Sequence, residues 1–311
     1  MLLRASAADE SKRLDSFITE KTGLSRSQAR KLIDSGLALL NGKPPPKAGE
    51  RLRPDDSVEI TVPEPAREGL VPEPIPLKVV FEDEHLIVVD KPADMVVYPA
   101  TGHNRGTLMN AVAYHSKRLA SIGAPLRAGV VHRLDKDTTG LMVIALTDNA
   151  YYGLARQFKD RSIKRSYAVI VHGEPKENEG TIELKIGRSE SNRKKMSTKV
   201  RRGREALTRW KVIERFGVAA LVQAVLGTGR THQIRVHFAS TGHPVLGDRT
   251  YGRKTDVEVK GNKIHIPRQM LHARELGFVH PETGGGLHFE SPMPPDMKGL
   301  LEKLRELKMK A

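Results

Sequence analysis

One carboxylate, Asp135, stands in a short polar segment between two apolar runs, residues 128–131 and 141–146. The length of these runs and their β-branched residues are typical of buried strands. A carboxylate at a strand end, with Arg133 before it and the hydroxyl of Thr138 after it, can serve as a nucleophile or as a general base. An aspartate in a turn also commonly bonds its own backbone, so the local sequence leaves both roles open.

The net charge indicates what such a carboxylate would act on. The chain of 311 residues has 52 lysines and arginines and 37 aspartates and glutamates, a formal net charge of +15. A surplus of this size favours a polyanionic partner, because each phosphate that a cation neutralises releases counterions. We therefore expect a nucleic acid as the partner; a merely soluble basic protein is the alternative.

Several kinds of site are excluded. The chain has no cysteine, which excludes disulfides, thiol catalysis, iron–sulfur clusters and thiolate zinc sites. The first 17 residues lack the apolar stretch of a secretory signal, and no apolar run reaches the roughly 18 residues of a membrane span. His232 and His237 are five residues apart, whereas two metal ligands on one helical face are about four apart. We expect a cytoplasmic monomer without a metal site or a membrane segment.

The length allows two domains of about 150 residues each, and residues 10–62 predict a small N-terminal α/β domain. Ser25 and Gln28 have the spacing of a capping box, which opens a helix that ends near Gly36. Strands are expected around it at residues 37–40 and 57–62. The residues of this helix that we expect to contact RNA are Arg26, Arg30 and Lys31.

Residues 63–76 contain five prolines, a composition typical of an extended linker between domains, although a surface loop is the alternative. Residues 77–305 then predict a larger domain. Its expected strands are residues 77–82, 86–90, 166–171, 181–186, 209–213 and 219–226, and its expected helices are residues 106–116 and one capped by Asp148. Because these elements do not form regular β-α-β repeats, we expect an α+β fold with a mixed, largely antiparallel sheet.

The segment from Lys185 to Arg204 contains nine basic residues and one acidic residue, Glu190. Like charges at this density repel one another in a compact fold. We expect a hairpin or loop that contacts RNA phosphates, with a solvated surface loop as the alternative. The residues expected to make these contacts are Arg193, Lys194 and Lys195.

Residues 132–141, HRLDKDTTGL, resemble the signature of the RluA family of pseudouridine synthases. Further matches follow in the family's order at residues 90–93, 102–108, 164–167, 229–237, 242–252 and 271–273. The similarity covers residues 77–305. Residues 11–62 resemble the alpha-L RNA-binding module that many members of the family carry. The resemblance therefore implies a pseudouridine synthase fold with an added RNA-binding domain.

The implied reaction converts uridine to pseudouridine within RNA, without net redox change or hydrolysis, so no cofactor is expected. Asp135 would act by attacking the sugar or the uracil, or by taking a proton from the sugar. The resemblance makes Arg235 the ionic partner that keeps this carboxylate charged. It makes Tyr167 the ring that stacks on the target base.

The resemblance also implies that Arg133 fills the space left when the uridine leaves its duplex. The other residues expected to bind substrate are His132, Leu271 and Arg230. Two positions depart from the family pattern, which usually has Gly where Asp94 stands and His where Tyr98 stands. Both lie at the entrance in the family picture, so they would affect substrate choice or the conformation of the loop.

We therefore expect an RNA pseudouridine synthase, with large-subunit ribosomal RNA as the favoured substrate. Transfer RNA is the enzymatic alternative, and an inactive RNA-binding or ribosome-assembly protein is the alternative from another class. A glycoside hydrolase would usually need two suitably spaced carboxylates. Asp137, two residues after Asp135, does not obviously meet that geometry.

Overall fold

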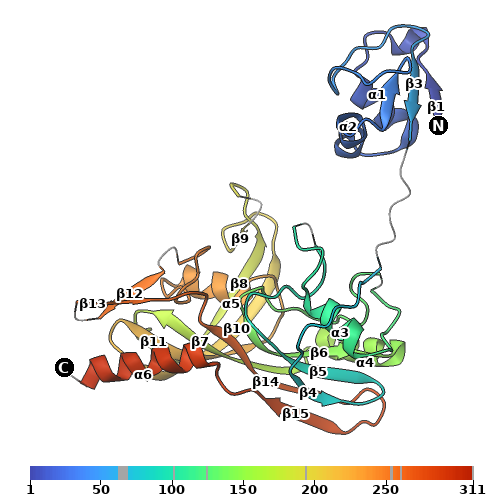
Figure 1. The fold of residues 1–311 in the computed structure, drawn as a ribbon. Helices are drawn as coiled ribbons and strands as arrows, with labels where there is room; N and C mark the ends of the chain where they lie inside the picture. The colour runs from blue at the N-terminus through green and yellow to red at the C-terminus, as the bar shows by residue number, and fades with distance from the viewer. Residues whose placement is uncertain are drawn as a thin grey trace. The chain divides into compact units, whose positions relative to one another are not determined.

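The computed structural model describes residues 1–61, 69–100, 102–123, 125–192, 195–252, 255–259 and 261–309. The chain divides into two units, Met1–Arg67 and Glu68–Ala311, which Figure 1 shows. Within the described ranges, no helix combines the length and the apolar character needed to cross a membrane.

The smaller unit packs helices against a three-stranded antiparallel sheet of order β1-β3-β2. Its elements are β1 (Leu2–Arg4), η1 (Ala7–Asp9), α1 (Leu14–Thr22), α2 (Arg26–Asp34), β2 (Ala38–Leu40) and β3 (Ser57–Ile60). The predicted capping box is confirmed, because the hydroxyl of Ser25 accepts from the backbone N–H of Gln28 and the Gln28 side chain accepts from that of Ser25. Gly36, with φ +72°, ends the segment in the left-handed region.

The larger unit is built on one ten-stranded sheet, in the order β4-β5-β6-β14-β7-β11-β10-β8-β9 with β15 paired to β14. The strands are β4 (Val79–Glu82), β5 (Leu86–Lys91), β6 (Thr139–Ala145), β7 (Lys164–His172), β8 (Glu179–Arg188), β9 (Met196–Ser197), β10 (Arg204–Arg215), β11 (Ala219–Leu226), β14 (Leu271–Val279) and β15 (Gly286–Glu290). Among these strands, β6 and β14 form the one parallel pair. A separate hairpin joins β12 (Asp256–Val259) and β13 (Asn262–His265). The predicted α+β class is confirmed.

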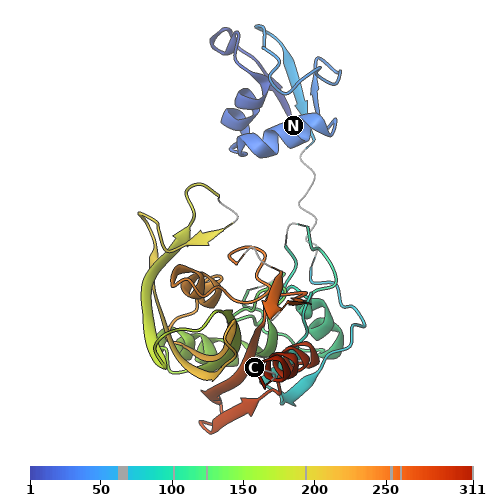
Figure 2. The same ribbon diagram turned by 90° about the vertical axis from the view of Figure 1, so that its left-hand side faces the viewer.

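Helices cover both faces of this sheet, and alternation along the strands assigns each side chain to a face. On one side, Tyr167 and Val169 of β7 share a core with α3 (Leu108–His115) and α5 (Gln233–Ser240). On the other, Ala168 and Ile170 of β7 pack with α6 (Pro295–Met309), while α4 (Asp148–Asp160) packs on β6. Figure 2 shows β8 and β10 curving round α5, which contacts both strands.

The structure corrects the expectation of a strand at residues 128–131. This segment is a turn followed by irregular chain, with one bridge between Val130 and Ile144. The cause is Gly129, whose φ of +72° lies in the left-handed region and whose missing Cβ would stand 2.0 Å from the carbonyl oxygen of Ala145. A continuous strand is incompatible with that backbone conformation.

A smaller correction concerns the start of α4. Thr147 caps this helix by accepting from the backbone N–H of Ala150. Asp148, the expected cap, instead accepts hydrogen bonds from the backbone and hydroxyl of Ser121.

The second half of the proline-rich segment lies against the larger unit. The carbonyl of Val71 accepts from the side chain of Asn110, and the N–H of Glu73 donates to the carbonyl of Asn110. The larger unit therefore begins before residue 77, the start that the sequence predicts. Residues 62–68, which include part of the predicted linker, lie outside the described ranges.

Gly140 joins the predicted catalytic loop to the sheet. Its φ is +111°, and a Cβ there would stand 2.2 Å from the carbonyl oxygen of Ala273 on β14. We predict that Gly140→Ala lowers the free energy of unfolding by about 3 kcal/mol or more, because backbone strain is added to a collision that β6 and β14 cannot relieve without separating.

The matched control is Gly284→Ala. Gly284 has φ +71° and open space around it, so this variant should lose only about 1 kcal/mol, from backbone strain alone. Urea denaturation of both variants measures the difference. Equal losses would contradict the role of close packing at Gly140.

Candidate active site

Asp135 lies in the irregular segment between residues 131 and 138, at a pocket of about 450 Å³. Leu134, buried in the core, anchors the segment on one side. The ammonium of Lys91, fully buried, donates to the carbonyls of Lys136, Pro92 and Met95. Because the residue that follows Asp135 is held in this way, the carboxylate has little freedom to move.

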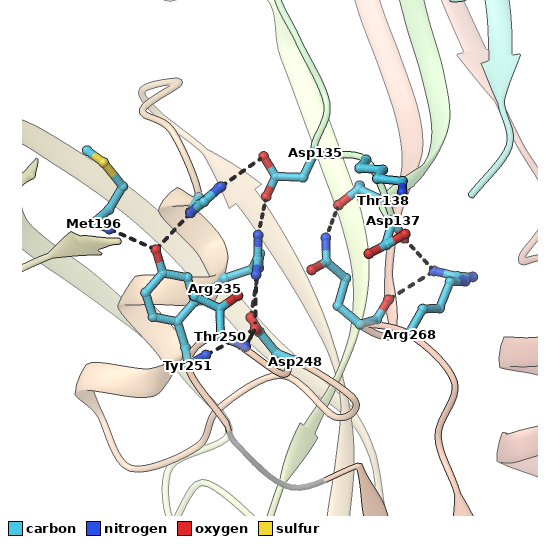
Figure 3. A network of polar contacts seen from close by, with 12 residues as sticks. Asp135, Asp137, Thr138, Met196, Arg235, Asp248, Thr250, Tyr251 and Arg268 are labelled. Atoms are coloured by element: carbon cyan, nitrogen blue, oxygen red, sulfur yellow. Dashed lines mark hydrogen bonds and ion pairs between the residues drawn. The ribbon is translucent and has the colours of Figure 1, made fainter. Parts of the chain in front are cut away.

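A guanidinium shared by two carboxylates dominates the site (Figure 3). Arg235 of α5 donates from Nη1 to Asp135 at 2.8 Å, and from Nε and Nη2 to the two oxygens of Asp248 at 2.7 and 2.9 Å. Asp248 also accepts the backbone N–H groups of Thr250 and Tyr251. The predicted pairing of Asp135 with Arg235 is therefore present in the structure.

Burial by itself would lower the pKa of Arg235. The hydrogen bonds to Asp248 and the charges of Asp135 and Asp248 outweigh that effect, so the pKa of Arg235 lies above its ordinary value. The guanidinium is thus a permanent positive charge beside Asp135. It compensates a carboxylate that is only 15% exposed.

His232 stands on the other side of Asp135, with Nε2 3.8 Å from Oδ1 of the carboxylate. Its Nδ1 lies 2.7 Å from the hydroxyl of Tyr251, which also accepts the backbone N–H of Met196 at 3.0 Å. Burial lowers the pKa of His232, although the charge of Asp135 opposes the shift. His232 has φ +57°, a conformation uncommon for a non-glycine residue, directly before α5.

Tyr167 and Leu271 form an apolar wall of the same pocket. Tyr167 is 6% exposed and Leu271 is 4% exposed, and both belong to the main core cluster. Burial raises the pKa of Tyr167, so its hydroxyl keeps its proton at neutral pH. The structure therefore places a ring, an aliphatic side chain and a carboxylate around one cavity, as the sequence predicts.

Arg133 lies exposed at the rim of the pocket. Its Nη1 donates to the hydroxyl of Tyr98 at 2.8 Å, and its guanidinium carbon lies 5.4 Å from the centroid of that ring. The guanidinium of Arg127 approaches the same ring, at 4.4 Å. Tyr98, one of the two departures from the family pattern, thus holds Arg133 in this structure. Asp94, the other, forms an ion pair with Lys136 at 2.9 Å.

His132 and Arg230 also line the pocket, but backbone groups hold part of each side chain. Nε2 of His132 accepts the backbone N–H of Val143, and its ring stacks on Phe158 at 4.7 Å. Burial, followed by the charge of Arg165, lowers the pKa of His132 to about 3. Nε of Arg230 donates to the carbonyl of Glu205. His132 is therefore a neutral residue that orients the loop of Asp135.

The expected RNA contacts on the smaller unit are exposed on α2. Arg26 forms an ion pair with Asp15 at 3.3 Å, Arg30 pairs with Asp34 at 3.5 Å, and Lys31 is exposed. In the basic segment, Lys195 donates to the carbonyl of Thr250. Arg193 and Lys194 lie outside the described residues.

The arrangement suits chemistry by one oriented carboxylate. Among the described residues, no group of three or more His, Asp or Glu side chains is arranged to hold a metal ion. The charged side chains that line the pocket are Arg127, Arg133, Asp135, Lys159, Arg165, Arg230 and Arg235. Six of these seven side chains are basic, so the surface around Asp135 is suited to a polyanion.

Sequence reasoning assigns no role to Asp248 or Lys91, although both lie in segments that match the family pattern. Asp248 holds Arg235, and Lys91 holds the loop of Asp135. Residues 247–252 are rich in polar turn residues next to an apolar run, and this is the signal that could have drawn attention to Asp248. Nothing local distinguishes Lys91 from a surface lysine.

Known proteins resemble this chain in sequence and in fold. The family described as RNA pseudouridylate synthase matches residues 85–240, and the S4 domain matches residues 12–58. An uncharacterized RNA pseudouridine synthase of Bacillus subtilis (strain 168) is 41% identical over 305 residues, covering 98% of both chains.

Two further matches extend the comparison. The ribosomal large subunit pseudouridine synthase D of Zymomonas mobilis is 44% identical over 287 residues, covering 91% of this chain and 90% of the relative. The solved structure of human RNA pseudouridylate synthase domain containing 1 has a TM-score of 0.56 and 27% identity, covering 74% of this chain and 95% of that chain.

We predict that Asp248→Asn lowers the free energy of unfolding by about 3 kcal/mol, because removing one partner of a buried ion pair leaves the other charge poorly compensated. The control is Glu214→Gln, which breaks an ion pair with Arg305 whose members are both partly exposed. That variant should lose at most about 1 kcal/mol. Urea denaturation at pH 7 measures both, and similar losses would contradict the importance assigned to Asp248.

A second prediction follows from the pKa of about 3 at His132. The unfolded chain binds this proton near pH 6.5 and the folded chain near pH 3, so stability falls as the pH is lowered through that window, by up to about 1.4 kcal/mol per pH unit. His132→Gln stays neutral and retains an acceptor for Val143. It should lose less stability on acidification.

Urea denaturation at pH 7, 6, 5 and 4 checks this expectation. The exposed His103→Gln variant is the control and should follow the wild-type curve. If His132→Gln also followed it, the ring of His132 would not be protected from protonation.

Proposed function

This chain belongs to the RNA pseudouridylate synthase family, and we propose that it converts specific uridines of large-subunit ribosomal RNA to pseudouridine. The resemblance to the RluA family that the sequence motifs indicate is confirmed at the level of the family. The enzyme class is therefore that of an RNA pseudouridine synthase. The catalytic roles and the RNA substrate are our proposals.

The observation that carries the proposal is the carboxylate of Asp135, which faces the pocket between Arg235 and Tyr167. Arg235 donates to one oxygen of Asp135. The other oxygen lies 3.8 Å from Nε2 of His232, and no side chain among the described residues donates a hydrogen bond to it. One carboxylate oxygen is thus left for a substrate. A nucleoside that enters must pass Tyr167, whose ring can stack on the uracil at a gain of about 1–3 kcal/mol.

The reaction breaks the bond from uracil N1 to the sugar and joins C5 to the same sugar carbon. The proton on C5 leaves and N1 gains one, so atoms and charge balance within the uridine. Asp135 acts either by attacking the sugar or the uracil, or by removing and returning a sugar proton. Arg235 compensates its charge in each route. Leu271 packs against the base, and Arg133 leaves Tyr98 to fill the duplex space that the uridine vacates.

Ribosomal RNA is the substrate that the relatives favour, because several are named ribosomal large subunit pseudouridine synthase D. An S4 domain in the same chain as the catalytic unit supports the same choice, since two tethered RNA contacts reinforce each other. We propose that Arg26, Arg30, Lys31 and the basic segment at residues 193–195 supply contacts to RNA phosphates. We further propose that the enzyme acts as a monomer in the cytoplasm.

The test maps pseudouridines in ribosomal and transfer RNA from cells with and without the gene, complemented by wild type, Asp135→Asn or Asp137→Asn. Asp137 lies two residues away in the same loop but not among the residues that line this pocket. We expect loss of a ribosomal site without the gene, rescue by wild type and Asp137→Asn, and no rescue by Asp135→Asn. In vitro, Asp135→Asn should be slower by about 1,000-fold or more.

Each part of the proposal can fail separately. Loss of a transfer RNA site in place of a ribosomal one would contradict the substrate and keep the catalytic role. Full activity of Asp135→Asn would contradict the role of the carboxylate. A strain with Asp135→Asn could also grow normally while lacking the modification. That result would be compatible with both the ribosomal substrate and the catalytic role of Asp135.

A further inference from the structure

Arg165 is a buried cation for which the proposed reaction has no role. It lies on β7, is 7% exposed, and lines the pocket of Asp135. Its Nε is buried and has no hydrogen-bond acceptor, and among the described residues no carboxylate pairs with it. Its guanidinium carbon lies 5.1 Å from the centroid of the Phe158 ring.

The other buried arginines are compensated. Among the described residues three arginines are buried, and Arg235 and Arg268 are each bound by a carboxylate through two nitrogens. Arg165 has an aromatic face in place of an anion. Burial lowers the pKa of Arg165, and the nearby Tyr167 keeps its proton at neutral pH, so it supplies no compensating charge. A buried charge without a partner destabilises the protein that carries it, so an uncompensated guanidinium in a pocket indicates a ligand.

The position of Arg165 fits one part of a nucleotide. Arg165 and Tyr167 are two residues apart on one strand, so they point to the same face, about 6.6 Å apart along β7. If the uracil stacks on Tyr167, the sugar and its phosphate extend from the base over this distance. The neighbouring Gly229 leaves room for the guanidinium, because a Cβ there would stand 2.9 Å from Nη1 of Arg165.

We propose that Arg165 binds a phosphate group next to the target uridine and so fixes the nucleotide that Tyr167 stacks. This inference rests on the proposed function, because it requires a nucleotide in the pocket. A phosphate supplies the missing negative charge, and its two free oxygens match the fork of the guanidinium. A uracil carbonyl could accept a hydrogen bond but would leave the positive charge uncompensated.

The first test compares stability with RNA binding in Arg165→Met, which keeps the length of the side chain and removes its charge. A structural residue would lose stability on substitution. Because Arg165 is uncompensated in the free protein, this variant should unfold at the same temperature as wild type or at a higher one. It should nevertheless bind a short substrate RNA about 10- to 100-fold more weakly. Arg165→Lys should lie between the two, because it keeps the charge without the fork.

The second test identifies the phosphate. Binding is measured for RNA oligonucleotides in which one linkage beside the target uridine is an uncharged methylphosphonate. One such linkage should weaken RNA binding by the wild-type protein about as much as Arg165→Met does. In the Arg165→Met variant, the same linkage should weaken RNA binding little further. The slope of log K against log salt should fall by about 0.7 in the variant. Arg165→Met could impair binding while no single methylphosphonate linkage weakens binding by the wild-type protein. That result would overturn the phosphate assignment in favour of a carbonyl contact.

Gly229→Ala supplies an independent variant that leaves the charge in place. The added Cβ must displace the tip of Arg165, so binding should weaken in the wild-type background and change little in Arg165→Met. Gly299→Ala is the matched control, since a Cβ at Gly299 has no atom within 4 Å. Equal effects of Gly229→Ala in both backgrounds would mean that it acts by some route other than Arg165.

These measurements are made in Asp135→Asn, so that binding is read without turnover, and in the active enzyme. A wild-type enzyme that forms no pseudouridine would refute the proposed function. An active wild type whose KM is unchanged by Arg165→Met would refute only the role of Arg165.

Discussion

The site depends on a guanidinium that two carboxylates share. Asp248 takes two nitrogens of Arg235 and is itself fixed by the backbone N–H groups of Thr250 and Tyr251. Arg235 is therefore held by contacts that do not involve Asp135, and its remaining nitrogen, Nη1, determines where one oxygen of Asp135 must lie. Since an unpaired ion in this environment would be costly, the two carboxylates and the cation stabilise each other only in this arrangement. The orientation of the other Asp135 oxygen, for which we propose the catalytic role, follows from that constraint.

The sheet supplies rigidity to the rest of the pocket. Alternation along β7 directs Tyr167 toward α5 and Ala168 toward α6, so the wall that would receive a base is also the surface of the main core. Leu271 enters from β14, which pairs with β7 and, through its one parallel register, with β6. Gly140 permits that close register. The groups for which we propose substrate contacts thus come from segments that are far apart in sequence but joined by neighbouring strands.

The sequence predicted those features that depend on local pattern or on a motif. The capping box at Ser25, the strands near residues 86–90 and 219–226, and the α+β class follow from periodicity and turn chemistry. The strand expected at residues 128–131 was wrong because one glycine with positive φ outweighs a short apolar run. The partner of Arg235 beyond Asp135 could not be predicted, because Asp248 reaches it only once α5 and the following loop have packed. The same holds for Lys91, whose acceptors are carbonyls of two separate loops.

The hydrogen bonds around His232 determine whether a ring N–H or a ring lone pair of His232 faces the second oxygen of Asp135. Burial raises the pKa of Tyr251 and lowers that of His232, so a protonated phenol faces a neutral imidazole. The Tyr251 oxygen already accepts the N–H of Met196, and donating its own proton to Nδ1 of His232 satisfies both groups. The single ring proton of His232 then resides on Nε2 and points toward Asp135. The opposite tautomer would aim a lone pair at the carboxylate. At 3.8 Å the contact is too long for a hydrogen bond, so it stabilises the charge while leaving that oxygen available to a substrate.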